Sequence, residues 1–134
     1  MIEKEKLDDA VICKKDDSSL EVSRIMRDTQ TRHVIVVDNG LQPLGIISTF
    51  DINNRVVAEE KDAKNVKAED IMTKPIESVD IKMSYDEAYR KMIDLSVYTI
   101  PVIDEGKLVG ILDFNFLFKK LCGIMNGGKK KWKV

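Results

Sequence analysis

Residues 18–28 read SSLEVSRIMRD, and residues 84–94, which lie 66 positions later, read SYDEAYRKMID. Each stretch starts as a capping box, a serine followed three residues later by a glutamate, and continues with apolar residues at helical spacing. The two stretches share five residues, with Ser18 on Ser84, Glu21 on Glu87, Arg24 on Arg90, Met26 on Met92 and Asp28 on Asp94. The duplication therefore predicts one helix that occurs twice.

Outward from these helices, the duplication continues into apolar, β-branched runs that predict strands. One residue drops out of the second copy, so that Gly45 aligns with Gly110 at a shift of 65. Each copy therefore reads strand, helix, strand, strand, helix. The strands are expected at 10–13, 34–37 and 44–47 and again at 76–79, 100–103 and 108–112, and the closing helices at 48–57 and 114–125.

Length and composition limit the classes of protein that the chain can form. At 134 residues it fits one compact domain, or two small units that share a core, and its 43% apolar residues suffice for that core. The net charge of −1 argues against a broad basic face for nucleic acid, and no apolar run reaches the length of a membrane span. Because the N-terminal residues do not follow a signal-peptide pattern, we expect a cytoplasmic protein without a membrane partner.

The sequence contains few residues that could act in catalysis or bind a metal ion. Cys13 and Cys122 have no metal-ligand spacing around them and are interpreted as small apolar core residues, while His33 is the single histidine. The sequence brings no nucleophile, base and orienting residue together, and it contains no glycine-rich phosphate loop. We therefore expect no catalytic residues, no metal site and no catalytic cofactor.

Several stretches together resemble the CBS-domain family. They are GIISTFDI at 45–52, DIMTKP at 70–75, IPVID at 100–104 and LVGIL at 108–112. The resemblance, which covers about residues 7–122, implies an α/β (α+β) fold of two βαββα CBS repeats packed about a pseudo-twofold axis. The expected domains are the first repeat at 7–62, a linker and short turn at 63–75, the second repeat at 76–125 and a flexible basic tail at 126–134.

The resemblance also implies a function. Such tandem pairs, called Bateman modules, commonly bind AMP, ADP, ATP or S-adenosylmethionine in clefts between the repeats, and they regulate another protein rather than catalyse a reaction. We therefore expect an adenosine nucleotide as a regulatory ligand, a homodimer and a regulated partner in trans. The alternative is a dimerisation or interaction scaffold that has lost its ligand. Its apolar surface is expected from Leu117, Phe118 and Leu121 on the closing helix of the second copy, with Val56 and Val57 on that of the first.

Asp51 and Ser48 are the first candidate site residues, because in the family this aspartate takes both ribose hydroxyls and this serine lies near the phosphate. The chemistry fits, since a carboxylate can accept two hydrogen bonds from a cis-diol. The alternative is purely local, because residues 48–51 also form a helix-start signature of the capping-box kind.

The other candidate site residues follow from the geometry of the family. The backbone of the first strand is expected to contact the adenine, the residues before the second strand to line the cleft, and their counterparts to reach the phosphate across the pseudo-twofold axis. These residues are, in that order, Ala10 and Val11, then Thr31, Arg32 and His33, then Tyr98 and Thr99. Two alternatives stay open, namely that Arg32 and His33 face the second cleft, and that His33 is a surface residue.

The second copy departs from the family pattern at two positions. Asp113 stands where Ser48 does, and Phe116 stands where Asp51 does. A phenyl ring cannot bind a diol, and an anionic side chain would repel phosphate. We therefore predict a single nucleotide site.

The basic tail, which includes residues 129–133, has two interpretations. It is either an electrostatic handle for nucleic acid, an anionic membrane or an acidic partner, or a solvated terminus.

Overall fold

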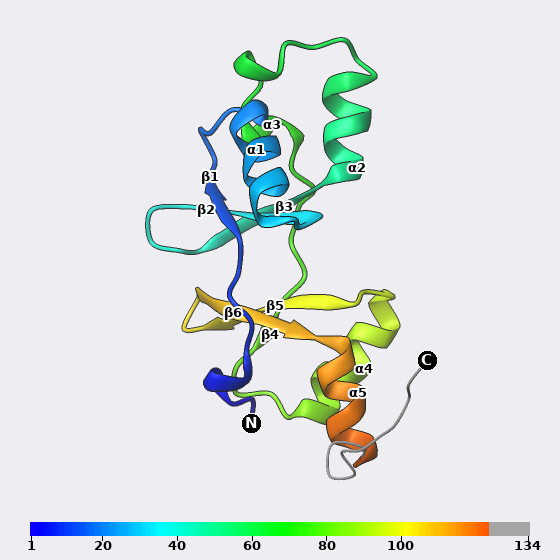
Figure 1. The fold of residues 1–134 in the computed structure, drawn as a ribbon. Coiled ribbons are helices and arrows are strands. Elements are labelled where there is room, and N and C mark those ends of the chain that lie inside the picture. Colours follow the sequence, from blue (N-terminus) through cyan, green and yellow to red (C-terminus); the bar gives the residue numbers. More distant parts are fainter. Residues whose placement is uncertain (124–134) are drawn as a thin grey trace, which may run out of the picture. The chain divides into compact units, whose positions relative to one another are not determined.

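The computed structural model describes residues 1–123. They form a mixed α+β structure with two three-stranded sheets, which confirms the expected fold class (Figure 1). The chain divides into two compact units. Unit 2 contains residues 10–76 and 105–108, and unit 1 contains residues 1–9, 77–104 and those from 109 onward. The predicted basic tail lies outside the described residues.

Unit 2 holds the first sheet, in the order β1-β2-β3. Strand β1 is parallel to β2, and β2 is antiparallel to β3. The first strand begins two residues later than expected, at Ile12, where its pairing with Ile35 starts. The elements are β1 (Ile12–Lys14), α1 (Ser19–Thr29), β2 (His33–Val37), β3 (Pro43–Ser48), α2 (Thr49–Ile52) with its π-helical continuation η2 (Asn53–Val57), η3 (Ala63–Asn65) and α3 (Ala68–Ile71).

The second sheet has the order β4-β5-β6, with β4 parallel to β5. The expected strand at 76–79 is wrong in its bounds, because parallel pairing with β5 begins only where Val79 meets Val102. The elements of this part of the chain are η1 (Lys4–Lys6), β4 (Val79–Asp80), α4 (Tyr85–Leu95), β5 (Thr99–Asp104), β6 (Lys107–Asp113) and α5 (Phe114–Cys122).

Both predicted capping boxes are confirmed. The Ser18 hydroxyl accepts a hydrogen bond from the amide of Glu21 at 3.1 Å, and the Ser84 hydroxyl accepts one from the amide of Glu87 at 3.1 Å. Each glutamate in turn accepts a hydrogen bond from the serine amide, which is the main reason why the pKa of both carboxyl groups is lowered. The duplication in the sequence therefore produces the same helix start twice.

Each unit has its own hydrophobic core between a sheet and its helices. In unit 2 the core includes Val22, Val36 and Cys13, and burial raises the pKa of the Cys13 thiol to about 12, with the charge of Asp17 adding to the effect. This thiol therefore stays neutral, as expected of a core residue. Cys122 differs from the expectation, because it is exposed at the end of α5.

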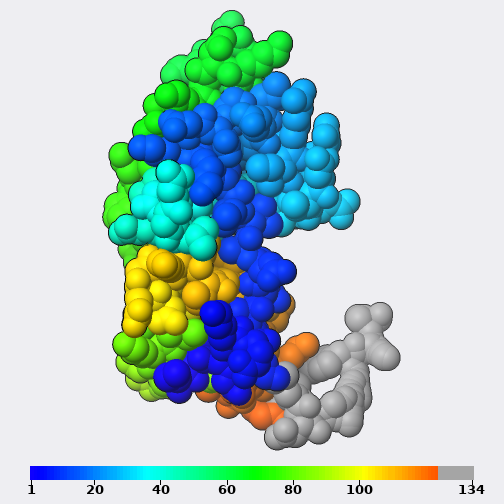
Figure 2. All heavy atoms as spheres, turned by 90° about the vertical axis from the view of Figure 1, so that its left-hand side faces the viewer, coloured from blue at the N-terminus to red at the C-terminus, as the bar shows by residue number. Residues whose placement is uncertain are grey.

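The two units are interleaved in sequence. Asp8, near the N-terminus, pairs with Ile111 of β6 through two backbone hydrogen bonds of 2.9 Å. Thr73 pairs with Ile46 of β3 through backbone hydrogen bonds of 2.8 and 3.0 Å. The segment before the first strand of each copy therefore pairs with the last strand of the other copy's sheet. In the space-filling view, the dark blue N-terminal residues lie against the yellow and orange residues of unit 1 (Figure 2).

Glycine permits this close approach in both sheets. A Cβ atom at Gly45 would lie 2.9 Å from the carbonyl oxygen of Thr73, and a Cβ atom at Gly110 would lie 2.8 Å from the Cβ atom of Leu7. Real Cβ atoms do not approach other atoms this closely. The aligned glycines in the two copies therefore have the same structural cause.

Candidate functional site

The carboxylate of Asp51 lies at the start of α2, where it is held by the residue that caps the helix. Its Oδ2 atom accepts hydrogen bonds from the backbone amide of Ser48 at 2.8 Å and from the Ser48 hydroxyl at 3.1 Å. The same hydroxyl accepts a bond from the Asp51 amide at 3.2 Å, so that the predicted local capping box is present. Asp51 is only 8% exposed, and the carboxylate is therefore a buried, oriented anion.

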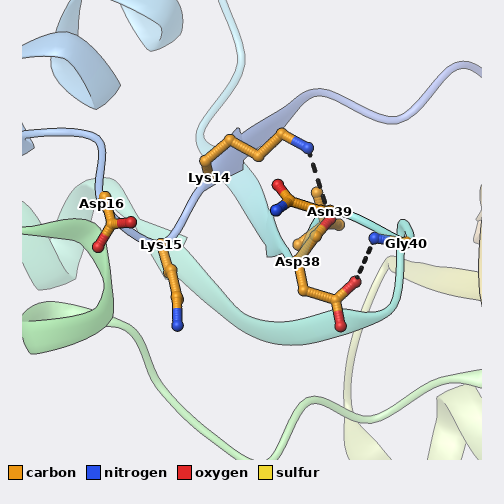
Figure 3. A pocket seen from close by; sticks show the side chains of 7 residues that line it. Lys14, Lys15, Asp16, Asp38, Asn39 and Gly40 are labelled. Carbon is orange, nitrogen blue, oxygen red and sulfur yellow. Dashed lines mark hydrogen bonds between the residues drawn. The ribbon is translucent and has the colours of Figure 1, made fainter.

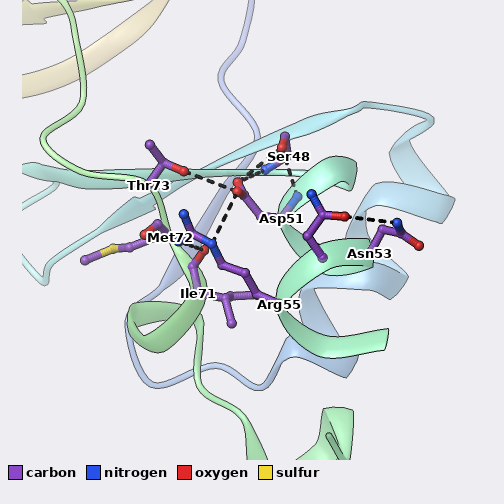
Figure 4. A network of polar contacts seen from close by, with 8 residues as sticks. Ser48, Asp51, Asn53, Arg55, Ile71, Met72 and Thr73 are labelled. Atoms are coloured by element: carbon purple, nitrogen blue, oxygen red, sulfur yellow. Dashed lines mark hydrogen bonds and ion pairs between the residues drawn. The ribbon is translucent and has the colours of Figure 1, made fainter. Parts of the chain in front are cut away.

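Two residues that sequence reasoning missed complete the surroundings of this carboxylate. The Thr73 hydroxyl donates a hydrogen bond to Asp51 Oδ1 at 3.2 Å, and Arg55 Nε lies 3.9 Å from the same oxygen. The Arg55 guanidinium also donates through Nη1 to the carbonyl oxygens of Ile71 and Met72, at 3.0 and 3.1 Å (Figure 4). Arg55 therefore joins the helix that carries Asp51 to the segment that carries Thr73.

The predicted residues before the second strand lie beside the start of α2. His33 is the register partner of Ser48 in the β2–β3 pair, and the carbonyl oxygen of Arg32 accepts a hydrogen bond from the Thr49 amide at 3.1 Å. The Thr31 hydroxyl lies 2.9 Å from the hydroxyl of Thr29. Unit 2 therefore brings the backbone of Arg32 and His33 to the end of the sheet that holds Ser48.

The remaining predicted residues lie at the start of unit 2 or in unit 1. Ala10 and Val11 precede β1, and the Val11 carbonyl accepts a hydrogen bond from the Ile35 amide at 2.9 Å. Thr99 begins β5 in unit 1, where the neighbouring Tyr98 is 78% exposed and meets the ring of Phe114 edge-on. The contribution of Tyr98 and Thr99 to a site at Asp51 stays a prediction.

The second copy shows what replaces the Ser48–Asp51 pair. Asp113 caps α5, because its Oδ2 atom accepts a hydrogen bond from the Phe116 amide at 3.1 Å. The Phe116 ring packs against the core of unit 1 and meets the ring of Tyr85 at an edge. The helix start is thus kept in both copies, whereas only the first copy presents a carboxylate at the fourth position.

A separate hollow of about 300 Å³ lies at the other end of the first sheet. It is lined at the carboxyl ends of β1 and β2 by Lys14, Lys15, Asp16, Val37, Asp38, Asn39 and Gly40 (Figure 3). The ammonium group of Lys14 reaches the carbonyl oxygen of Asp38 at 3.5 Å, and the Asp38 carboxylate accepts a bond from the Gly40 amide at 2.9 Å. None of the predicted site residues lines this hollow.

The part of the chain that the structure describes contains neither a candidate metal-binding cluster nor a helix that could span a membrane. Over residues 1–123 there is no group of three or more histidine, cysteine, aspartate or glutamate side chains that could hold a metal ion. No helix within the same range has the length and apolar character needed to cross a membrane.

Comparison with known proteins relates the chain to one family. The family model for the CBS domain matches residues 6–58 and 68–115. An uncharacterized protein of Methanopyrus kandleri is 33% identical over 97 residues, which are 72% of this chain and 50% of that protein. A homoserine O-acetyltransferase of Methanococcus vannielii is 29% identical over 89 residues, which are 66% of this chain and 18% of the enzyme. The chain therefore spans about half of the first relative and a small part of the second.

A solved structure gives the same relation at the level of the fold. A protein with CBS domains from Burkholderia ambifaria has a TM-score of 0.72 and 24% sequence identity, and the match covers 98% of this chain and 93% of that chain. At this level of identity, the likeness supports the arrangement of strands and helices and says nothing about the ligand.

Proposed function

This chain belongs to the CBS-domain family, and we propose that it is a regulatory module that binds an adenosine compound through Asp51. The two matched segments are consistent with a tandem CBS pair, which is a regulatory type of module. The ligand would be AMP, ADP, ATP or S-adenosylmethionine, and the regulated protein would be a partner in trans. The homoserine O-acetyltransferase of Methanococcus vannielii matches over 18% of its length, so its activity is not carried over to this chain.

The observation that best supports the proposal is the state of the Asp51 carboxylate. It is buried and fixed by Ser48, so that it loses little conformational freedom when a ligand binds. Its position beside the backbone of Arg32 and His33 agrees with the cleft expected from the family resemblance. A ribose diol could donate two hydrogen bonds to this carboxylate, and bonds to a charged acceptor are the stronger class.

The proposed mechanism is a shift of population. An adenosine compound that binds one arrangement of the module more tightly than another favours that arrangement by the difference in binding free energy. The partner then responds to the arrangement and not to the ligand itself. No covalent bond is made or broken in this mechanism, and it needs no catalytic group.

Thermal unfolding with AMP, ADP, ATP, GTP and S-adenosylmethionine tests the proposal. A ligand at 100 times its dissociation constant should add about 2.7 kcal/mol to the free energy of unfolding. For a chain of this size, that corresponds to a rise in Tm of several degrees. A rise with one adenosine compound, and not with GTP, would identify the signal. If none of the five compounds raises Tm, the ligand-sensing function is wrong and the scaffold described next becomes the better account.

The alternative function, a homodimeric scaffold, is favoured by exposed apolar side chains on two helices. Phe50 and Val57 are 71% and 63% exposed on α2 and its continuation, and Phe118 and Leu121 are partly exposed on α5. Two residues that the sequence suggested for this surface, Val56 and Leu117, were wrongly assigned to it. Both side chains pack into the cores of their own units and are at most 2% exposed.

Sedimentation at micromolar concentration measures whether these surfaces join two copies of the chain. We expect a dimer, because apolar side chains that are exposed on a helix gain free energy when they are covered. The change Phe50→Ala removes the most exposed of the four side chains and should shift the equilibrium toward the monomer. A wild-type chain that sediments as a monomer would exclude the scaffold in its homodimeric form.

A further inference from the structure

The Asp51 carboxylate has fewer free acceptor positions than a ribose diol requires. Two carboxylate oxygens offer about four acceptor positions. Within residues 1–123, Oδ2 accepts two hydrogen bonds from Ser48, and Oδ1 accepts one from the Thr73 hydroxyl. One position on Oδ1 is left, and Arg55 Nε, at 3.9 Å, is too distant to fill it with a hydrogen bond. A cis-diol that donates two hydrogen bonds must therefore displace one of the present donors.

Thr73 is the donor that can leave most readily. The bond from the Ser48 amide belongs to the capping box at the start of α2. The Ser48 hydroxyl, which donates the other bond, also accepts the Asp51 amide at 3.2 Å and is therefore held at the same helix start. The Thr73 hydroxyl makes the longest of the three bonds, at 3.2 Å. It can also turn away by rotation of one side-chain torsion, because the Thr73 backbone is held independently by both of its hydrogen bonds to Ile46.

Arg55 makes this exchange local. Arg55 follows Asp51 by one helical turn, and its guanidinium donates hydrogen bonds to the carbonyl oxygens of Ile71 and Met72, the two residues before Thr73. The segment therefore keeps its place when the Thr73 side chain turns (Figure 4). The competition between ligand and protein for Oδ1 then concerns a single hydroxyl group.

We propose that the Thr73 hydroxyl competes with the ribose for Asp51 and so sets how strongly the site distinguishes ribose from deoxyribose. This inference rests on the proposed adenosine site. In the wild-type protein, the second ribose hydroxyl replaces the bond from Thr73 and gains little. A 2′-deoxy compound, which has one hydroxyl in place of the diol, fits the free acceptor position and displaces nothing. Thr73 therefore reduces selectivity for ribose at this site, in contrast to a residue that contacts the ligand.

The change Thr73→Val tests the inference, because valine has the shape of threonine without the hydroxyl group. AMP, ADP and ATP are each titrated calorimetrically beside their 2′-deoxy counterparts into the wild type, Thr73→Val and the control Thr73→Ser, which keeps a hydroxyl. In Thr73→Val, the ratio of the deoxy to the ribo dissociation constant should rise about ten- to 100-fold, the range expected for one hydrogen bond to a charged acceptor. Thr73→Ser should keep the wild-type ratio.

The outcomes separate this inference from the function on which it rests. A higher ratio in Thr73→Val supports the competition, since a merely structural role for Thr73 would weaken both compounds alike. An unchanged or lower ratio, with wild-type binding intact, overturns the competition and leaves the adenosine site standing. If neither the wild type nor the variants bind any of these nucleotides, this inference is wrong, and the proposed adenosine site is wrong as well unless S-adenosylmethionine raises the Tm of the wild type.

Discussion

Replacement of Leu117 by alanine should lower the free energy of unfolding by about 2–5 kcal/mol, the range measured when buried leucine side chains are truncated in tightly packed cores. Leu117 lies on α5, is fully buried and belongs to the core cluster of unit 1. The loss has two parts. One is the free energy that burial of the removed carbon atoms contributes in the wild type, and the other is the cost of the cavity that the surrounding side chains cannot close. Denaturant unfolding followed by circular dichroism measures the change.

Phe118→Ala is the matched control, since Phe118 is the next residue on the same helix and is 41% exposed. Its ring stacks on that of Phe114, with 6.5 Å between the ring centroids, so that truncation should cost only about 1 kcal/mol. If the two variants lost equal stability, the assignment of Leu117 to the core and Phe118 to the surface would be wrong.

Asp51→Ala should weaken binding of the adenosine compound by about 1.5–3 kcal/mol, or roughly tenfold to 150-fold in the dissociation constant. The ribose hydroxyls would lose a charged acceptor that the fold holds in place through Ser48 and Thr73. Asp51→Asn, which keeps the shape of the side chain but not its charge, should show an intermediate loss. Calorimetric titration measures both changes.

The control for Asp51 is Asp113→Ala. Asp113 also serves the start of a helix, by accepting the Phe116 amide at 3.1 Å, but it lies in the copy that lacks the aspartate of the family motif. We expect this variant to lose some stability, as helices do when a cap is removed, and to bind nucleotide as the wild type does. Equal loss of binding in the two variants would point to a general effect of helix caps.

Local signals in the sequence predicted local structure well. The capping boxes at Ser18 and Ser84 depend on residues three positions apart, and the strand at 34–37 is a continuous apolar run, so that each can be identified without knowing the rest of the fold. The bounds of β1 and β4 were less accurate, because a strand begins where its pairing with the neighbouring strand begins. Val79 pairs with Val102, which is far away in sequence.

The surroundings of Asp51 could be predicted only in part. The bond with Ser48 is local and follows from the motif, and Arg55 could have been noticed, because it lies one helical turn beyond Asp51. Thr73 could not, because its place depends on backbone pairing with Ile46, and this pairing results from the interleaving of the two units. The sequence contains no periodic signal for such an exchange of edge segments.

The most direct test of the central claim, that Asp51 binds a ribose diol, compares each adenosine nucleotide with its 2′,3′-dideoxy counterpart in the wild type and in Asp51→Ala. The dideoxy compound lacks both donors, so the wild type should bind it roughly ten- to 100-fold more weakly than the ribo compound. Asp51→Ala should bind the two compounds with nearly equal affinity, because the acceptor is gone. A wild-type protein that binds both compounds equally, or a variant that still prefers the ribo compound, would contradict the assignment of Asp51 to the ribose.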